Sequence, residues 1–449
     1  MDTKEIKQTV LANILKPLES LSEKIPSVYI GIIAVVGLLG FACLICFPVL
    51  IIIGIESIAT IFIDNFTSNY ETWVSISQWV SITLFSILVT YSHYFTKFSL
   101  PTGIQLSRGN VPELFNLIDE LKADYKWIAI DRIIITDKYE LDIVTTPKYV
   151  LPIWNTHTLK IGLAMMECLS PTHFKCMLAR KLGQFSKHQN FLPNLLYQLR
   201  YDWQSHNEAF TENRSLGILP LALFFRIYAP FYKLISTYIA RIDELNADLA
   251  ALRVINDEEV LDTVQQNIIA RHFIEKSYWP KVREVINKKP SANPAPFEKL
   301  YLTFKNVEGK QDVLNLLKLK YAIKPGYDNP MPSLKNQVLN IGHTKLIKPS
   351  INKTSAALEL LGKNYKRVVA LTDKLWLKNT ASDWKAQATK VHRERALFKS
   401  LYNKAKLEKL SYKEMWQYTK LRRRLSGNKT TIPWQNLLLR RIPELATIK

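Results

Sequence analysis

The chain is poor in residues that interrupt regular structure. Glycine occurs 14 times and proline 21 times among 449 residues. Linkers and disordered segments are usually rich in these two residues, so we expect no long disordered stretch.

Cysteine is also scarce, with four residues in the chain. Cys43 and Cys46 lie inside an apolar run, while Cys168 and Cys176 are eight residues apart and lack the spacing of a metal site. We therefore expect small buried thiols in a reducing compartment.

Charge is missing from two long runs near the N-terminus, between Lys24 and Glu56 and between Glu71 and Lys97. A bilayer core needs about 20 apolar residues, so the first run can span it, and its length and position argue against a cleaved signal peptide. The second run contains several serines and threonines, but aromatic residues suited to membrane interfaces lie near its ends; these are Trp73, Trp79, Tyr91 and Tyr94. The two runs predict a transmembrane hairpin over residues 27–97.

Lysine and arginine are absent from the linker Asp64–Glu71 between these runs. Basic residues do flank the hairpin, and the positive-inside rule therefore places both chain ends in the cytoplasm; they are Lys4, Lys7, Lys16 and Lys24 before it, and Lys97 and Arg108 after it. We predict an integral membrane protein, in the inner (cytoplasmic) membrane if the source is bacterial, with its main domain in the cytoplasm.

A third apolar stretch, Leu216–Ala240, is interrupted by Arg226 and Lys233. We interpret it as a pair of core helices packed on the helix that contains Arg180. Re-entry into the membrane is the alternative.

The remaining chain predicts a cytoplasmic N-terminal segment (residues 1–26), a main domain (98–345) and a basic α-helical region (346–449). Periodicity indicates a helix over 110–123, strands over Ile130–Thr136 and Asp142–Thr146, and helices at about 171–190, 191–214, 218–240, 241–254 and 257–276. Prolines mark residues 288–296 as a linker. The region beyond Thr354 reads as helical, and we expect its large aromatic residues to be core anchors; they are Trp376, Trp384, Trp416 and Trp434.

Acidic residues are scarce in the C-terminal third. Residues 281–449 hold 36 lysines and arginines against 12 acidic residues, a surplus of 24, while the whole chain carries +21. Clusters such as Lys363–Arg367 and Lys420–Arg424 suit an anionic partner. Beside a bilayer that partner is the lipid surface, where a basic residue contributes about 1 kcal/mol. An acidic protein, RNA or a solvated basic surface stays open, although no RNA-binding motif with stacking aromatics is recognisable, which argues against nucleic acid.

Residues Leu178–Phe185 have the frame of a zinc-peptidase helix without its zinc ligands. In the motif H-E-x-x-H two histidines one helical turn apart bind one metal ion, and the glutamate is the general base. Arg180, Lys181 and Gln184 stand at the positions of histidine, glutamate and histidine.

The flanking sequence resembles the HtpX and CAAX prenyl endopeptidase family of membrane zinc metallopeptidases over roughly residues 100–340. Thr158–Leu163 resembles the family's edge strand and turn, and Leu169–Pro171 its helix start, where Ser170 can cap and Pro171 suits the first turn. Arg241–Asp248 resembles its E-x-x-A-D helix, and Asn329–Leu334 its histidine-proline segment, with Met331 in place of the histidine. The resemblance implies that Glu244 stands at the third zinc-ligand position and Asp248 at the position that supports the ligands.

The implied fold is α+β and helix-rich, with an N-terminal transmembrane hairpin, a zincin-like metallopeptidase core with a small β-sheet, and a C-terminal α-helical region. Catalytic zinc, however, needs three protein ligands. Arg180 has no lone pair, Gln184 offers only a weak carbonyl oxygen, and Lys181 becomes a base only if its pKa falls by several units. We expect no catalytic residue, no bound metal and no cofactor.

Histidines near the motif do not rebuild the site by themselves. His188 follows the motif by one helical turn and His173 precedes it by about two turns. We expect both to face solvent, as we do for the isolated His157 and His206. A relocated metal site is the alternative.

Loss of zinc would leave Glu244 buried without a cation, which is costly. We predict that Arg180 fills the metal position and pairs with Glu244, because a guanidinium fork matches a carboxylate. Lys181 points about 100° around the helix and is expected to meet Asp248 or solvent.

These features predict a membrane-anchored metallopeptidase-family protein that has lost its zinc site, a non-catalytic binding or regulatory pseudopeptidase in membrane protein quality control. Its partners would be the lipid bilayer and a protein partner or an unfolded membrane protein. The alternative is an active zinc metalloendopeptidase with an unconventional or partner-completed site.

Overall fold

The computed structural model describes residues 15–63, 69–124, 130–147, 155–184, 191–288, 295–306, 311–326, 328–407 and 410–426. The chain divides into two compact units. The first contains residues 1–274 and 297–372, and the second contains residues 275–296 and 373–449. Most of the predicted proline-rich linker lies outside the described residues.

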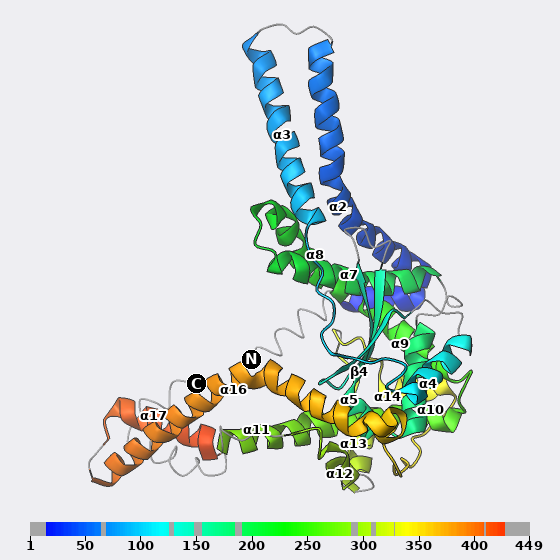
Figure 1. Cartoon of the computed structure of the whole chain (residues 1–449), viewed down its shortest axis with the longest axis vertical. Helices are drawn as coiled ribbons and strands as arrows, with labels where there is room; N and C mark the ends of the chain where they lie inside the picture. The colour runs from blue at the N-terminus through cyan, green and yellow to red at the C-terminus, as the bar shows by residue number, and fades with distance from the viewer. Residues whose placement is uncertain are drawn as a thin grey trace. The chain divides into compact units, whose positions relative to one another are not determined.

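Two long apolar helices run side by side in the first unit (Figure 1). They are α2 (Pro26–Ile63) and α3 (Tyr70–Tyr94), and they cover the two uncharged runs. A Cβ atom at Gly54 would overlap the Thr83 hydroxyl, so glycine lets the helices approach closely. These two helices and the segment Leu216–Ile235 are the three described segments that are long and apolar enough to cross a membrane. Residues 64–68 of the predicted external loop lie outside the described residues.

The third apolar stretch forms a short 3-10 turn, η1 (Leu216–Ile218), and helix α8 (Leu219–Ile235). After Ser236 the chain continues as α9 (Thr237–Ala251). The prediction of a pair of helices within Leu216–Ala240 is wrong, because this stretch holds one complete helix, α8, and only the first turn of α9. Of the two, α9 packs closely on the helix that contains Arg180. Helix α8 packs instead on α7 (Phe191–Glu212) and α2, and its opposite face is exposed.

The first unit also contains a sheet with the strand order β1-β2-β4-β3, drawn below α7 and α8 in Figure 1. Its strands are β1 (Ile104–Gln105), β2 (Arg132–Thr136), β3 (Leu141–Pro147) and β4 (Asn155–Gly162). Strands β2 and β4 are parallel, and the other two pairs are antiparallel. The prediction that Thr158–Leu163 begins with an edge strand is wrong: β4 is internal, because β3 folds back on one side of it while β2 pairs on the other. The edge strands of this sheet are β1 and β3.

Helix α6 (Pro171–Gln184) follows the sheet and the short helix α5 (Leu163–Cys168). Its predicted start is confirmed, because the Ser170 hydroxyl accepts a hydrogen bond from the His173 backbone N–H at 3.2 Å and Pro171 is the first helical residue. The other helices of this unit are α4 (Pro112–Asp124), α10 (Asp257–Phe273), α12 (Leu300–Lys305), α13 (Gln311–Ala322), α14 (Leu334–Ile341) and α15 (Ala356–Leu361). The result is a helix-rich unit built on a small sheet.

The second unit contains α11 (Trp279–Lys288), most of the long helix α16 (Tyr365–Leu407) and α17 (Tyr412–Ser426). Trp376 is buried and stacks on Trp279 with ring centroids 5.3 Å apart, as expected of a core anchor. Trp416 is 64% exposed, so the expectation that it is a core residue is wrong. The opposite face of α17, with Tyr418, packs on α16, and that leaves Trp416 outside. The side chain of Trp384 and all of Trp434 lie outside the described residues.

Candidate functional site

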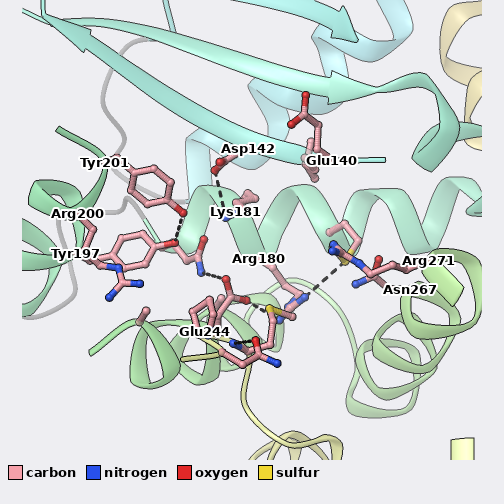
Figure 2. A pocket seen from close by; sticks show the side chains of 18 of the residues that line it. Glu140, Asp142, Arg180, Lys181, Tyr197, Arg200, Tyr201, Glu244, Asn267 and Arg271 are labelled. Atoms are coloured by element: carbon pink, nitrogen blue, oxygen red, sulfur yellow. Dashed lines mark hydrogen bonds and ion pairs between the residues drawn. The ribbon is translucent and has the colours of Figure 1, made fainter. Parts of the chain in front are cut away.

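Helices α6 and α9 pack against each other and bring the two predicted motifs together. Arg180 and Gln184 are one helical turn apart on α6, and Glu244 and Asp248 are one turn apart on α9. Side chains at this spacing share one face of a helix. The four side chains therefore meet between the helices. Figure 2 shows Arg180 and Glu244 of this set.

Arg180 is the centre of this ion cluster. Its Nη2 atom lies 3.3 Å from Glu244 Oε2, and its Nε atom lies 2.7 Å from Asp248 Oδ1. Gln184 Nε2 donates a hydrogen bond to Glu244 Oε1 at 3.0 Å, and Gln337 Nε2 of α14 donates one to Asp248 Oδ2 at 3.2 Å. The prediction that Arg180 pairs with Glu244 is confirmed.

Lys181 points away from this cluster. Its Nζ atom lies 3.4 Å from Asp142 Oδ1 on the edge strand β3. The prediction that it meets Asp248 or solvent is wrong, because the 100° turn from Arg180 directs Lys181 toward the sheet while Arg180 takes Asp248. Burial alone would lower the pKa of Lys181, but Asp142 and Glu244 outweigh it and raise the pKa above its usual value. Lys181 therefore stays protonated and cannot accept a proton as a general base.

The electrostatics of Glu244 follow from the same contacts. Burial by itself would raise the pKa of this carboxyl, but the charges of Lys181 and Arg180 and the Gln184 amide lower it. The neighbouring Asp243 is mainly affected by its own burial, which raises its pKa to about 8. The cluster thus keeps Glu244 ionised.

A cavity of about 500 Å³ opens beside the cluster. Arg180, Lys181, Gln184 and Glu244 all line it, together with Pro330 and Met331. The segment that contains Pro330 and Met331 therefore reaches the same place as the two helices.

Arg241 of α9 holds that segment against the cavity. Its Nε atom donates to the Asn329 carbonyl at 3.0 Å and its Nη2 atom to the Gly326 carbonyl at 2.7 Å, while Nη1 lies 2.9 Å from Glu19 Oε1. The sequence pattern around Arg241 does not predict this role.

The other walls of the cavity were missed from the sequence. Tyr197 and Tyr201 of α7 lie at one end, with their hydroxyl oxygens 3.0 Å apart, beside Arg200. Asn267 and Arg271 of α10 lie at the other end (Figure 2). The spacing of one helical turn between the two tyrosines was the only available signal, and it is equally typical of a core helix.

The donor set does not fit zinc. A guanidinium occupies the place between the two carboxylates, Gln184 directs an N–H group inward, and both oxygens of Glu244 already accept from Arg180 and Gln184. Within the described ranges, no three His, Cys, Asp or Glu side chains lie together as metal ligands would. Met331 supplies only a thioether, a poor zinc ligand.

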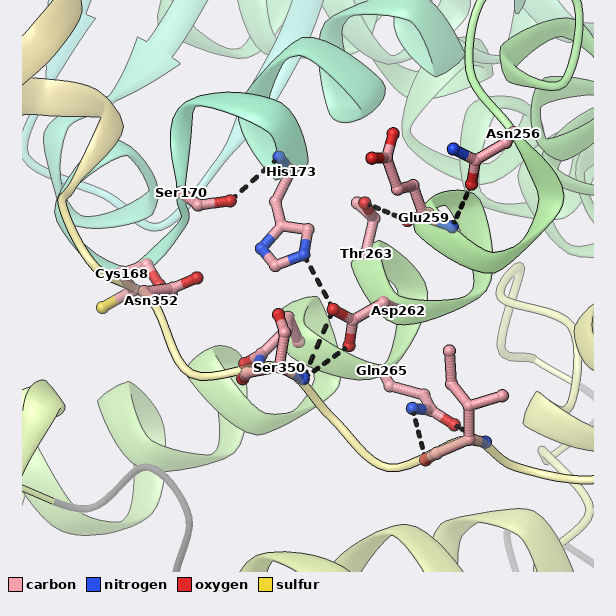
Figure 3. Close-up of polar contacts among 12 residues, drawn as sticks. Cys168, Ser170, His173, Asn256, Glu259, Asp262, Thr263, Gln265, Ser350 and Asn352 are labelled. Atoms are coloured by element: carbon pink, nitrogen blue, oxygen red, sulfur yellow. Dashed lines mark hydrogen bonds and ion pairs between the residues drawn. The ribbon is translucent and has the colours of Figure 1, made fainter.

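The histidines lie elsewhere. His173 is buried and its Nε2 atom lies 3.1 Å from Asp262 Oδ2 of α10, so the expectation that it faces solvent is wrong (Figure 3). Asp262 also accepts from the Ser350 backbone N–H at 3.2 Å, which joins α6, α10 and the extended segment before α15.

His206 was also expected to face solvent, and it too is buried, with Nδ1 2.7 Å from the Asp202 carbonyl oxygen. His157 is partly exposed, with Nδ1 3.2 Å from Thr145 Oγ1, and His188 lies outside the described residues.

Comparison of the chain with protein-family models, with curated proteins and with solved structures found no match.

Proposed function

We propose that this chain is a membrane-anchored pseudopeptidase that resembles the HtpX and CAAX prenyl endopeptidases, with a zincin-like core in which an ion cluster replaces zinc. The observation that carries the proposal is the position of Arg180 between Glu244 and Asp248. In a zinc peptidase of this kind a metal ion would neutralise the carboxylate of the second helix. Here the guanidinium does so.

The proposed role is non-catalytic. Peptide hydrolysis by a zincin needs a polarised water and a general base. Lys181 at the base position is held protonated by Asp142, and Glu244 is occupied by Arg180 and Gln184. Neither group can activate water.

A binding role is supported by the cavity that persists beside the cluster. One wall is the start of β3, which pairs with β4 on one side only and supplies Leu141 and Asp142 to the lining. An extended segment can add to such an edge through backbone hydrogen bonds. The two ends of the cavity offer hydroxyl, amide and guanidinium groups that could bind the side chains of such a segment. The proposed ligand is therefore an extended segment of a partner protein or of an unfolded membrane protein, in membrane protein quality control.

Metal content tests this proposal. We expect purified full-length protein to contain no stoichiometric zinc and to cleave neither soluble nor membrane substrates. One equivalent of zinc that a chelator removes, with proteolysis lost in parallel, would instead support an active peptidase.

A restoration variant tests the zincin-like core. Replacement of Arg180→His, Lys181→Glu and Gln184→His together rebuilds H-E-x-x-H opposite Glu244. If the core is zincin-like, this variant should gain about one equivalent of zinc, since three ligands then face one point. The same variant with Glu244→Ala is the matched control and should lose it. A restored variant that folds but binds no more zinc than its control would refute the zincin-like core.

A further inference from the structure

Helix α8 has an inner face, an exposed apolar ridge and a basic strip that borders this ridge. Phe225, Tyr228 and Tyr232 belong to its inner face, which is at most 6% exposed at these residues and packs on α7 and α2. Successive residues of a helix are about 100° apart, so positions three and four apart share a side. The inner face accounts for less than half of the helix circumference.

A second face of α8 is apolar and exposed. Leu219, Leu223, Ile227 and Phe231 are 53%, 56%, 76% and 47% exposed, and Leu216 in the preceding turn is 84% exposed. Their spacing of four residues makes one continuous ridge. An exposed ridge of five large apolar side chains is costly in water and marks a surface that meets an apolar partner.

A strip along one side of α8 is basic. Arg226 and Lys233 are both exposed, and seven residues, or two turns, separate them, so they point the same way. Lys233 also lines the cavity beside the ion cluster. Arg226 also lies two turns after Leu219, so these basic residues form a strip that borders the apolar ridge along one side, where the helix reaches the cavity.

The start of α8 is fixed to one end of α3. Ser215 Oγ lies 2.9 Å from Ser92 Oγ, and Asn213 Nδ2 donates to Thr96 Oγ1 at 2.8 Å. At this end of α3 three aromatic residues are exposed, as is typical of a membrane–water interface; they are Tyr91, Tyr94 and Phe95.

A contact with α2 fixes the second half of the helix. Tyr228 Oη donates to the Val36 carbonyl at 2.7 Å. Figure 1 shows α8 at the base of the α2–α3 hairpin, across the direction of the two long helices. Its position relative to the hairpin is thus set at both ends.

We infer that α8 lies in the plane of the membrane, with its apolar ridge in the acyl chains of the bilayer that holds the hairpin. The inference rests on the proposed membrane anchoring. It commits to lipid because the turn η1, where the ridge begins, packs on α3, which carries exposed apolar side chains such as Leu84 and Leu88. The ridge is also bordered by basic residues suited to headgroup phosphates. A third transmembrane span would instead place Arg226, near the middle of α8, among acyl chains, where a charged side chain is disfavoured.

An in-plane α8 has a consequence for the cavity. Because Lys233 belongs both to the basic strip of α8 and to the cavity lining, the cavity lies directly below the headgroups. A ligand of the cavity is then a segment of a membrane protein, close to the point where that protein leaves the bilayer.

Cysteine labelling tests the inference. The background is the full-length chain in which alanine replaces Cys43, Cys46, Cys168 and Cys176. Each variant has one new cysteine, at Arg226, Ile227 or Ile52, and Lys233→Cys is a second variant on the basic strip. Ile52 is 66% exposed and lies in the middle of the hairpin. A membrane-impermeant maleimide is supplied on both sides of proteoliposomes. Far-ultraviolet circular dichroism checks that each variant is folded. A substitution that misfolds in the cysteine-free chain is made instead in the chain with its native cysteines, and the labelling of that chain is subtracted.

We expect Arg226→Cys and Lys233→Cys to react at least tenfold faster than Ile227→Cys, and Ile52→Cys to be protected. Protection of Arg226→Cys together with Ile227→Cys would show a third span and overturn the inference. Oxidative cross-linking of Ile227→Cys into dimers would show a second copy on the ridge and would also overturn it. If Ile227→Cys is labelled fast while Ile52→Cys is protected, the in-plane position of α8 is refuted and the membrane anchoring stands. If Ile52→Cys is labelled fast, the membrane anchoring itself is refuted.

Discussion

Arg180→Met removes the guanidinium from the ion cluster and keeps most of the side-chain volume. The Arg180 side chain is 5% exposed, Glu244 15% and Asp248 0%, so neither carboxylate can gain full hydration in its place. Removing one partner of a buried pair typically costs about 3–5 kcal/mol. Gln184 and Gln337 keep one hydrogen bond to each carboxylate, so we expect the loss to fall within this range rather than above it.

The free energy of unfolding is measured from urea transitions of the full-length protein in mild detergent. Arg253→Met is the matched control, because Arg253 is exposed just beyond the end of α9, and we expect it to change stability by less than about 0.5 kcal/mol. In a double-mutant cycle, Arg180→Met combined with Asp248→Asn should cost about 1–3 kcal/mol less than the sum of the single changes.

The pH dependence has a definite sign. In the native protein the pKa of Glu244 is lowered, so its stabilising contribution is present above the unfolded pKa and is lost as pH falls through the folded value. In Arg180→Met burial is no longer opposed by the guanidinium, so the pKa of Glu244 and Asp248 should rise and the variant should regain stability as pH falls. The stability difference should shrink between about pH 7.5 and pH 5. A loss below about 1 kcal/mol that is the same at both pH values, or simple additivity in the cycle, would refute the reasoning.

Three further predictions concern other parts of the chain. Burial raises the pKa of Glu167 to about 8, so the native protein should lose stability as the pH rises from about 4.5 to 8. In urea transitions, Glu167→Gln should be more stable than the native protein by at least about 1 kcal/mol at pH 8.5 but not at pH 5. The exposed Trp416, flanked on α17 by Lys413 and Lys420, should contact anionic lipid. The fluorescence emission of a dye attached to Trp416→Cys in the cysteine-free chain should shift to the blue in anionic but not in neutral proteoliposomes, and about 0.5 M salt should abolish the shift. Reporter fusions at residue 68 and at the C-terminus should give opposite signals if the hairpin crosses the membrane with both ends in the cytoplasm, and equal signals would contradict that topology.

The elements of the first unit could be predicted because their patterns are local. The uncharged runs became α2 and α3, and the β-branched runs became β2 and β3. Ser170 and Pro171 marked the start of α6 through capping and a fixed φ angle. The order of the strands could not be predicted in this way, because β4 became internal only through its pairing with β2, a contact distant in sequence.

Within the site, prediction succeeded where one constraint fixed the partner. A buried carboxylate at Glu244 required a cation, and Arg180 was the nearest residue on the expected face. Prediction failed for Lys181 and His173 because their partners depend on how α6 sits between two other elements. Asp142 comes from the sheet on one side and Asp262 from α10 on the other, and nothing near Lys181 or His173 in the sequence indicates either.

The way in which Glu244 and Asp248 are paired also bears on the cavity beside them. Each oxygen of Glu244 and Asp248 has an ion-pair or hydrogen-bond partner: Arg180 reaches one oxygen of each, Gln184 the second of Glu244 and Gln337 the second of Asp248. Without these donors the buried oxygens would be unpaired, which is costly and would favour a local rearrangement. With the donors present, α6 and α9 keep a fixed separation without a metal ion, so the cavity beside them keeps its shape. A binding role for the cleft requires that rigidity, and it also implies that ligand binding should be insensitive to chelators, whereas a metal-dependent site would lose its ligand with its metal.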